Sequence, residues 1–149
     1  MRVGEFCSRE VIIVGKDETI QEAARLMREH HVGDVVVVEE REGGRHPVGI
    51  LTDRDIVVEL LAAGIALDAV SIGDAMSFEL ATAREGDGLI ETIGQMQEKG
   101  VRRIPVVDAR GDLVGILAID DLLEVVSEQL SGLVKVIARE QEREREIRH

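Results

Sequence analysis

Polar residues suited to binding a phosphate and a diol stand in "VGILTDRD" (48–55), where an apolar run passes into a helical pattern. Thr52 follows the apolar run and is a natural N-cap, so we expect free backbone N–H groups beyond it that could bind an anion. The guanidinium group of Arg54 offers a planar fork of donors for phosphate oxygens. The carboxylate of Asp55 can accept two hydrogen bonds from a vicinal diol, as in ribose recognition. A Thr-x-x-Asp sequence at a helix start is also an ordinary cap, so these residues alone leave both interpretations open.

The same junction recurs as "VGILAIDD" (114–121), with its phosphate-binding features changed. Ala118 lacks the threonine hydroxyl, and the loss of such a cap costs about 0.5–2 kcal/mol at a helix start. Asp120 stands where Arg54 stands and presents a negative charge. Asp121 keeps the carboxylate that suits a ribose. The second site is therefore weaker than the first, selective for a less phosphorylated ligand, or empty.

These junctions belong to a duplication that extends along most of the chain. Residues 3–14 align without a gap with 72–83, and the offset of 69 positions continues until 35–38 meets 104–107. The junction itself recurs 66 positions later, so the second copy has a connection three residues shorter. We place that difference between "EEREGGRHP" and "DARGD", because turn-like stretches tolerate changes of length.

Each copy has the pattern of strand, helix, strand, turn, strand and helix. The elements predicted in the first copy are a strand at 10–14, a helix within 17–32, hairpin strands at 34–40 and 47–51, and a helix from Asp53. Those predicted in the second copy are a helix at 89–99, strands at 102–107 and 113–117, and a helix at 119–130.

Individual residues predict details of these elements. Thr19 and Glu22 have the spacing of a capping box. Gly64 is expected as the C-cap of the helix from Asp53. Pro105 lies inside a predicted strand and cannot donate a ladder hydrogen bond, so that strand should be an edge strand or be interrupted there. The side chains expected to point inward from the helix after Asp53 are Ile56, Val57, Leu60 and Leu61.

One β-α-β-β-α unit has a single sheet and two helices, too little to close a core alone. Two units packed through their sheets as a pseudo-twofold pair would bury both apolar faces, which predicts an α/β (α+β) fold with repeats at 1–70 and 71–130. The remainder, 131–149, predicts a charged helix that docks on its own module or on a partner, or is simply solvated. Its apolar stripe consists of Leu130, Leu133, Val134 and Ile137.

Composition and charge exclude several classes of function. The chain of 149 residues has a formal net charge of -12 and 1% aromatic residues, so neither nucleic acid nor an anionic membrane is an expected partner. Cys7 is the single cysteine, no secretory signal pattern is visible, and no apolar stretch approaches the roughly 20 residues that span a bilayer. These features predict a cytoplasmic protein. No metal-ligand spacing and no nucleophile–base constellation is visible, so we expect neither a metal site nor an enzyme.

The segment "GILTDRD" matches the G-h-h-T/S-x-x-D signature of CBS domains, named after cystathionine β-synthase. The supporting segments are "LMREHHV" (26–32), "DAMS" (74–77) and "MQEKGVRRIPVVD" (96–108), together with the tandem arrangement itself. These features cover nearly the whole chain up to about residue 130. The chain therefore resembles a stand-alone pair of CBS domains, also called a Bateman module.

The resemblance implies a non-catalytic regulatory or sensor module that binds an adenosine-containing nucleotide in clefts between the repeats. AMP, ADP, ATP and NAD belong to that class, S-adenosylmethionine is a further candidate ligand, and no obligatory cofactor is implied. By this resemblance Thr52 and Arg54 would contact phosphate, and Asp55 would contact ribose hydroxyls. Asp121 would keep the ribose position in the second copy. CBS pairs commonly form disc-like dimers, so a homodimer and an unidentified regulated protein are the expected partners.

The family also places ligand contacts on the strand that follows the first helix of each repeat. The candidates there are Arg102, Arg103, Ile104 and Pro105, with Gly33 and Asp34 as the first-copy counterparts of the two arginines. The basic pair either supplies phosphate charge that Asp120 does not, or forms an exposed strand end. Thr82, late in the first strand of copy two, would face adenine. The alternative function is a structural dimerisation or protein-interaction module whose pockets are vestigial.

Overall fold

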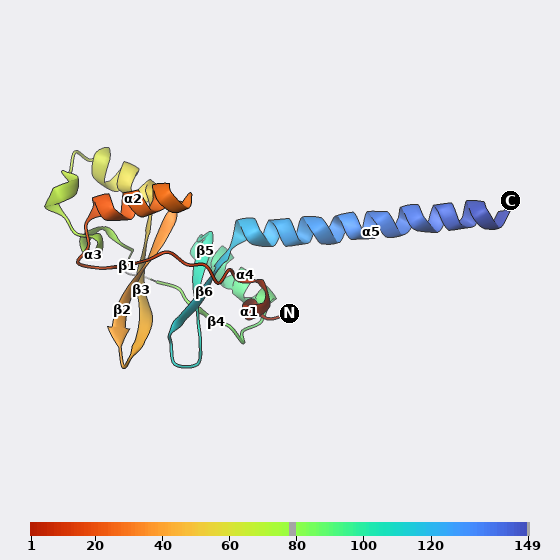
Figure 1. The fold of residues 1–149 in the computed structure, drawn as a ribbon, viewed down its shortest axis with the longest axis horizontal. Helices are drawn as coiled ribbons and strands as arrows, with labels where there is room; N and C mark the ends of the chain where they lie inside the picture. The colour runs from red at the N-terminus through yellow and green to blue at the C-terminus, as the bar shows by residue number, and fades with distance from the viewer. Residues whose placement is uncertain (78–79, 149) are drawn as a thin grey trace.

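The computed structural model describes residues 1–77 and 80–148, which form two similar halves with a long helix leaving the second (Figure 1). The first part of the chain forms α1 (Val3–Phe6), β1 (Ile13–Gly15), α2 (Ile20–His30), β2 (Asp34–Arg41), β3 (Gly44–Thr52), the π-helix η1 (Asp55–Leu61) and the 3-10 helix η2 (Leu67–Ala69). The second part forms α3 (Ile72–Ala75), β4 (Ala83–Arg84), α4 (Leu89–Lys99), β5 (Arg103–Val107), β6 (Leu113–Ala118) and α5 (Ile119–Arg148).

Each half contains a three-stranded sheet of the same topology. In the first sheet, ordered β1-β2-β3, strand β2 is parallel to β1 and antiparallel to β3. The second sheet, ordered β4-β5-β6, repeats this arrangement. Both central strands carry a register shift at the equivalent place, between Val37 and Val38 and between Val106 and Val107. The predicted duplication is confirmed to the level of this irregularity.

The two predicted hairpins form, but they differ in strand length. Glu42 (φ 51°) and Gly43 (φ 79°) join β2 to β3, and two consecutive positive φ values are typical of the type I′ turn that matches strand twist. The strands of this hairpin have 8 and 9 residues, against 5 and 6 in the second hairpin. The three-residue difference lies between the segments 39–47 and 108–112, where we placed it, but it shortens the strands of the second hairpin and not its turn.

Pro105 lies in the central strand of its sheet, so the expectation of an edge strand is wrong, but the alternative, an interruption at Pro105, is confirmed on the β4 side. Strand β5 runs between β4 and β6. The equivalent residue, Val36, donates its N–H to the carbonyl oxygen of Ile12 at 2.9 Å, on the β1 side of the sheet. Proline cannot make this bond, and β4 pairs with Val106 and Val107, so the ladder on that side begins just past Pro105.

Each half takes a short helix from the other repeat. The core around β4, β5 and β6 includes Val3 and Phe6 from α1, and the core around β2 and β3 includes Ile72 and Ala75 from α3. Cys7 packs on the same core as α1, where burial raises the pKa of its thiol. Residues after these helices bridge to the last strand of the other half, Ser8 to Ile116 and Ser77 to Ile50. The repeats are therefore interlocked.

Both faces of the sheets are covered. Val35 and Val37 of β2 pack into the core beneath the helices. Side chains alternate along a strand, so Val36, which is fully buried, points to the opposite face. Its equivalent in β5, Pro105, is fully buried as well, and β3 contacts β6. The predicted α/β pair packed through its sheets is confirmed.

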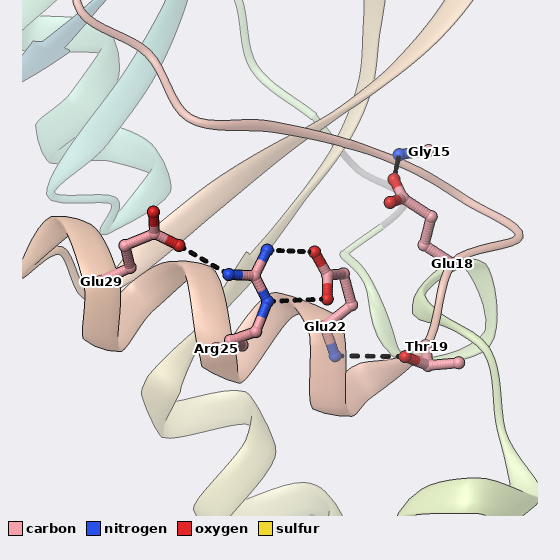
Figure 2. A network of polar contacts seen from close by, with 6 residues as sticks. All are labelled: Gly15, Glu18, Thr19, Glu22, Arg25 and Glu29. Carbon is pink, nitrogen blue, oxygen red and sulfur yellow. Dashed lines mark hydrogen bonds and ion pairs between the residues drawn. The ribbon is translucent and has the colours of Figure 1, made fainter.

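Helix α2 begins with half of the predicted capping box (Figure 2). The hydroxyl oxygen of Thr19 accepts the N–H of Glu22 at 3.1 Å. The carboxylate of Glu22 does not return to the cap, because it binds the guanidinium group of Arg25 at 2.6 Å. Arg25 also binds Glu29 at 2.6 Å, and Glu18 accepts the N–H of Gly15 in the preceding turn.

Helix η1 buries fewer side chains than its sequence pattern predicts. Ile56 and Leu60 are buried, but Val57 is 54% and Leu61 57% exposed. The N–H of Ala62 donates to the carbonyl oxygen of Val57, five residues back, which is the wider π-helical turn. This wider turn leaves one residue in four facing the core, so the prediction for Val57 and Leu61 is wrong. The chain then turns at Gly64, which has a positive φ of 74°.

Helix α5 continues without a break through the charged tail and projects away from both halves (Figure 1). Its 30 residues give a length of about 45 Å at 1.5 Å per residue. Leu122 is buried, but Leu130, Leu133, Val134 and Ile137 are all more than half exposed. The tail therefore does not dock on its own module. Within the described part of the chain, none of the helices is both long and apolar enough to cross a membrane.

Candidate functional site

Two pockets related by the duplication open between the halves. We call them the Thr52 pocket, of about 430 Å³, and the Ala118 pocket, of about 240 Å³. The Thr52 pocket is lined by Ile50, Thr52, Asp53, Arg54, Gly100, Val101, Arg102 and Arg103. The Ala118 pocket is lined by residues 8, 10–12, 31–34, 103, 116, 118, 120 and 121. Each pocket combines the start of the last helix of one repeat with the entry to the middle strand of the other.

Thr52 and Asp55 cap the start of the helix reciprocally. The N–H of Asp55 donates to the Thr52 hydroxyl oxygen at 3.1 Å, and the N–H of Thr52 donates to Oδ2 of Asp55 at 3.0 Å. The capping interpretation of this pair is therefore confirmed. The hydroxyl proton of Thr52 and the second oxygen of Asp55 lie outside these two bonds and are chemically able to bind a ligand.

Backbone N–H groups at this helix start are already in use. The N–H of Arg54 donates to the Asp53 carboxylate at 2.8 Å, and that of Asp55 donates to Thr52. The N–H of Asp53 donates to the carbonyl oxygen of Gly33 at 2.9 Å. The expectation of free N–H groups is wrong at these three positions, so an anion in this pocket would be bound by side chains.

Guanidinium groups outnumber carboxylates in the Thr52 pocket. Among the residues that the structure describes, Arg54, Arg102 and Arg103 line it together with one carboxylate, that of Asp53. Arg102 forms an ion pair with Asp120, at 3.1 Å between Nη2 and Oδ1, but the two side chains are 74% and 56% exposed. An ion pair that exposed is weak in water, so Arg102 remains available to an incoming phosphate.

The balance of charge is reversed in the Ala118 pocket. Its carboxylates are those of Glu10, Asp34, Asp120 and Asp121, and its one guanidinium group is that of Arg103. Ala118 supplies no hydroxyl, and the first N–H of α5 is bonded to the carbonyl oxygen of Arg102 at 2.9 Å. Because residue 118 is alanine, the N–H of Asp121 has no threonine hydroxyl oxygen to accept it, and the carboxylate of Asp121 is exposed.

Asp34 and Arg103 occupy equivalent positions of the two repeats and form an ion pair where the halves meet. The distance from Nε to Oδ2 is 2.5 Å, and the side chains are 13% exposed for Asp34 and 32% for Arg103. Burial raises the pKa of Asp34, with the Arg103 charge acting against it and the nearby Asp53 charge adding to it. Arg103 also lies 3.9 Å from Asp120, and it lines both pockets.

Four predicted site residues are not among the described residues that line either pocket, and the first of them, Asp55, is adjacent to the Thr52 pocket as the capping partner of Thr52. Ile104 is fully buried in the second core, and Pro105 is fully buried on the opposite face of β5. Thr82 is exposed just before β4 and is not among the described residues that line either pocket. Asp34, in contrast, lines the Ala118 pocket, and Arg102 lines the Thr52 pocket.

Sequence reasoning missed the N-terminal contribution to the Ala118 pocket. Residues 8 and 10–12 line it because the segment after α1 runs along β6. It also missed Gly100 and Val101 in the Thr52 pocket. The offset of 69 positions carried the signal for these two, since it maps 31–34 of one pocket onto 100–103 of the other.

Histidine and carboxylate side chains do not assemble into a metal centre in the described ranges, 1–77 and 80–148, where no group of three potential ligands occurs. His46 instead lies 3.3 Å from Asp112, joining the tips of the two hairpins.

The chain therefore has two sites at equivalent junctions of a duplicated fold, and comparison with known proteins finds the same repeat. The model of the CBS domain family matches residues 3–62 and again 72–128. The chain belongs to the CBS domain family. As a CBS domain pair, it carries both copies of the repeat in one small chain.

Relatives of this CBS pair occur in archaea and bacteria. An uncharacterized protein of Methanopyrus kandleri is 41% identical over 83% of this chain, which spans about three fifths (61%) of that relative's length. The CBS domain-containing protein YhcV of Bacillus subtilis is 37% identical over 80% of this chain and 81% of its own. The solved CBS domain pair of protein MJ0100, in complex with 5′-methylthioadenosine and S-adenosyl-L-methionine, superposes with a TM-score of 0.74 at 26% identity, covering 87% of this chain and 98% of that one.

Proposed function

We propose that this CBS domain pair is a regulatory module that binds an adenosine-containing ligand, with the Thr52 pocket as a phosphate-accepting site. The observation that carries the proposal is that Thr52, which is capped reciprocally with Asp55, lines one pocket of about 430 Å³ together with three guanidinium groups. This volume lies within the range of roughly 300–1,000 Å³ that small-molecule sites occupy. The adenosine ligands of the related MJ0100 pair support the class of ligand.

The proposed roles follow from the atoms left outside the cap. Thr52 accepts the N–H of Asp55, so its own hydroxyl proton can point to a phosphate oxygen. One oxygen of Asp55 holds the N–H of Thr52, and the other can accept a ribose hydroxyl. Arg54, Arg102 and Arg103 supply positive charge for the phosphate groups of AMP, ADP, ATP or NAD.

Ligand binding would act on the contact between the halves. A ligand shifts a conformational equilibrium only when it binds the two states with different affinity. An anion in the Thr52 pocket would compete with Asp34 and Asp120 for the guanidinium group of Arg103. The halves would then meet with a weakened ion pair, and a regulated partner could sense that difference.

Isothermal titration calorimetry with AMP, ADP, ATP and NAD tests the proposal. Asp55→Asn keeps an oxygen for the N–H of Thr52 but removes the charge, so affinity should fall about tenfold or more. Asp68→Asn is the matched control, because Asp68 is exposed in η2 and lines neither pocket. Unchanged affinity in the Asp55→Asn chain would remove the ribose role of Asp55.

A thermal-shift series decides between this function and a module with vestigial pockets. A ligand at 100 times its dissociation constant adds about 2.7 kcal/mol to the free energy of unfolding. No shift with any adenosine compound, phosphorylated or not, would overturn the binding function and favour the interaction module.

Dimerisation is a second proposed function, favoured by the uncovered face of α5. Its apolar side chains recur at alternating spacings of three and four residues, the pattern of a coiled-coil seam. They are Leu123, Val126, Leu130, Leu133 and Ile137, with Val134 beside them, and each of the six is 54–65% exposed. Val57 on η1, at the position equivalent to Leu123, is 54% exposed too. We propose that a second copy of the chain covers these surfaces.

Sedimentation velocity tests the dimer. Leu130→Glu should convert the dimer to a monomer, because it places a charge in the middle of the seam. Lys135→Glu, on the opposite face of the same helix, should leave the dimer intact. A monomeric wild-type chain at tens of micromolar would overturn the proposal.

A further inference from the structure

We infer that the Ala118 pocket selects adenosine compounds that carry no phosphate, and prefers those that carry a positive charge near the ribose. The inference rests on the proposed function, since it specifies which member of the adenosine class each pocket takes. The Ala118 pocket is then not simply a weaker copy of the Thr52 pocket, because it prefers a positively charged ligand where the Thr52 pocket prefers a negatively charged one.

The charges that line the Ala118 pocket carry this inference. Of the residues described by the structure, four carboxylates and one guanidinium group line the Ala118 pocket, whereas three guanidinium groups and one carboxylate line the Thr52 pocket. The reversal comes from single residues at equivalent positions, Asp120 for Arg54 and Asp34 for Arg103. A phosphate in the Ala118 pocket would meet like charge, which disfavours its binding.

Arg103 offsets only part of this charge. Its Nε is 2.5 Å from the Asp34 carboxylate and its Nη2 is 3.9 Å from that of Asp120, so its positive charge is already shared between two acids. Arg102 lines the other pocket, and its bond to Asp120 spans 3.1 Å at an exposed position. Counting both arginines, the four carboxylates of the pocket remain in excess.

Donors for a phosphate are also missing at the start of α5. Ala118 has no hydroxyl, and the N–H of Ile119 is bonded to the carbonyl oxygen of Arg102 at 2.9 Å. The feature that does remain is Asp121, whose exposed carboxylate has two oxygens that can accept the hydroxyls of a ribose diol. A nucleoside therefore keeps its carboxylate partner at this helix start, where a phosphate finds neither a hydroxyl at residue 118 nor a free N–H of Ile119.

The size of the pocket agrees with a smaller ligand. Its volume of about 240 Å³ is little more than half that of the Thr52 pocket, about 430 Å³. A nucleoside with a short substituent on its ribose has no phosphate chain to accommodate. A sulfonium substituent would in addition place a positive charge beside Asp120 and Asp34, where carboxylates attract it.

The test is isothermal titration calorimetry of the full chain with AMP, 5′-methylthioadenosine and S-adenosyl-L-methionine. In wild type we expect one AMP per chain, and one S-adenosyl-L-methionine that binds about tenfold tighter at low salt than 5′-methylthioadenosine. Asp120→Arg should weaken S-adenosyl-L-methionine about tenfold and raise the AMP stoichiometry from one to two. Glu128→Arg changes the net charge equally at an exposed position of α5 outside both pockets, and should reproduce wild type.

The outcomes separate this inference from the proposed function. One AMP bound per chain, with neither 5′-methylthioadenosine nor S-adenosyl-L-methionine bound at a second site, overturns the inference and leaves the proposed function standing. Two equivalent AMP sites in wild type also overturn it, as does an Asp120→Arg chain that binds all three compounds as wild type does. No binding of any of the three overturns the proposed function, and the inference with it.

Discussion

The strand-to-helix junctions at the ends of β3 and β6 share the sequence "VGIL", but the four residues that follow it differ in their charge and in their ability to cap a helix. In the first, Thr52 and Asp55 cap a short π-helix that curls over its own core. In the second, an alanine leads without such a cap into a straight helix of 30 residues. The buried positions of the strands have stayed alike while the charged and capping positions have diverged.

This difference shows how a duplicated fold can acquire two unequal sites. Sheet topology, bulge position and buried strand residues are shared, because each half needs them to close its core. The residues at the pockets have no such requirement, and opposite charges at Asp34 and Arg103 even join the halves. The predictions below test where the halves are equivalent and where they are not.

The largest effect should come from the shared cores. Leu51 and Leu117 are equivalent, fully buried, and each belongs to one core. Leu51→Ala and Leu117→Ala should each lower the free energy of unfolding by about 2–5 kcal/mol, from lost burial and the cavity left behind. Urea denaturation followed by circular dichroism measures this. Because the halves are interlocked, each variant should unfold in one transition, and a separate early transition in either would contradict this.

Glycines at equivalent strand positions should respond unequally to alanine. A Cβ at Gly115 would lie 2.7 Å from the carbonyl oxygen of Ser8, in a backbone segment bonded to β6. A Cβ at Gly49 would mainly meet the flexible end of Met76, with the nearest backbone oxygen at 3.0 Å. Gly115→Ala should therefore cost about 1–3 kcal/mol, and Gly49→Ala less, in the same urea experiment. An equal loss of stability in the two variants would contradict this difference between the segments that follow α1 and α3.

Removing one member of the central ion pair should leave a buried charge. Arg103→Ala should lower stability at neutral pH by about 1–3 kcal/mol, since the carboxylate of Asp34 loses its partner at a position that is 13% exposed. Arg102→Ala removes an exposed ion pair and should cost less than about 0.5 kcal/mol, which makes it the matched control.

The loss of stability that Arg103→Ala causes should depend on pH. Burial already raises the pKa of Asp34, and without Arg103 it rises further. A carboxyl group whose pKa is higher in the folded state loses stability as pH rises from its unfolded value through its folded one. The deficit should therefore shrink as pH falls toward the ordinary aspartate value of about 3.8. Urea midpoints measured between pH 7 and 4 would reveal this, and a deficit that grows in acid would contradict it.

The smallest effect should come from exchanging the caps. Thr52→Ala removes the oxygen that accepts the N–H of Asp55 and should cost about 1 kcal/mol. Ala118→Thr places a hydroxyl three residues before Asp121 and should gain up to about 1 kcal/mol. Thermal unfolding monitored by calorimetry compares the pair. A Thr52→Ala variant with unchanged thermal stability would contradict an energetic difference between the two junctions.

The fold could be predicted from the sequence because its signals are periodic and repeated twice. Helix α4 has the predicted bounds, 89–99, since its apolar spacing and the glycine that ends it are local signals. Val57 and Leu61 could not be placed, because the choice between an α-helix and a π-helix depends on packing outside the segment. The exposed stripe of α5 was visible in the sequence, but that it leaves its own module was not.

For the candidate site, the sequence predicted the positions of several residues but not the contacts between the two repeats. Thr52, Arg54 and Asp121 lie in the expected clefts because each belongs to a local motif. That Arg102 faces Asp120, and Arg103 faces Asp34, depends on how the halves meet, which the motif alone does not determine. Ile104 matched a pattern position but its side chain alternates into the core.

The exchange of α1 into the second core has a consequence for synthesis on the ribosome. Val3 packs among residues that extend to Leu122, so the segment made first meets its partners last. At about 5–20 residues per second, the wait is roughly 6–24 s. The first core, around β1–β3, can close only after α3 has been synthesised. Until the chain has been made as far as Leu122, Val3 and Phe6 of α1 lack part of the core against which they pack. A nascent chain of this protein is therefore complete as a fold only when its C-terminal half is.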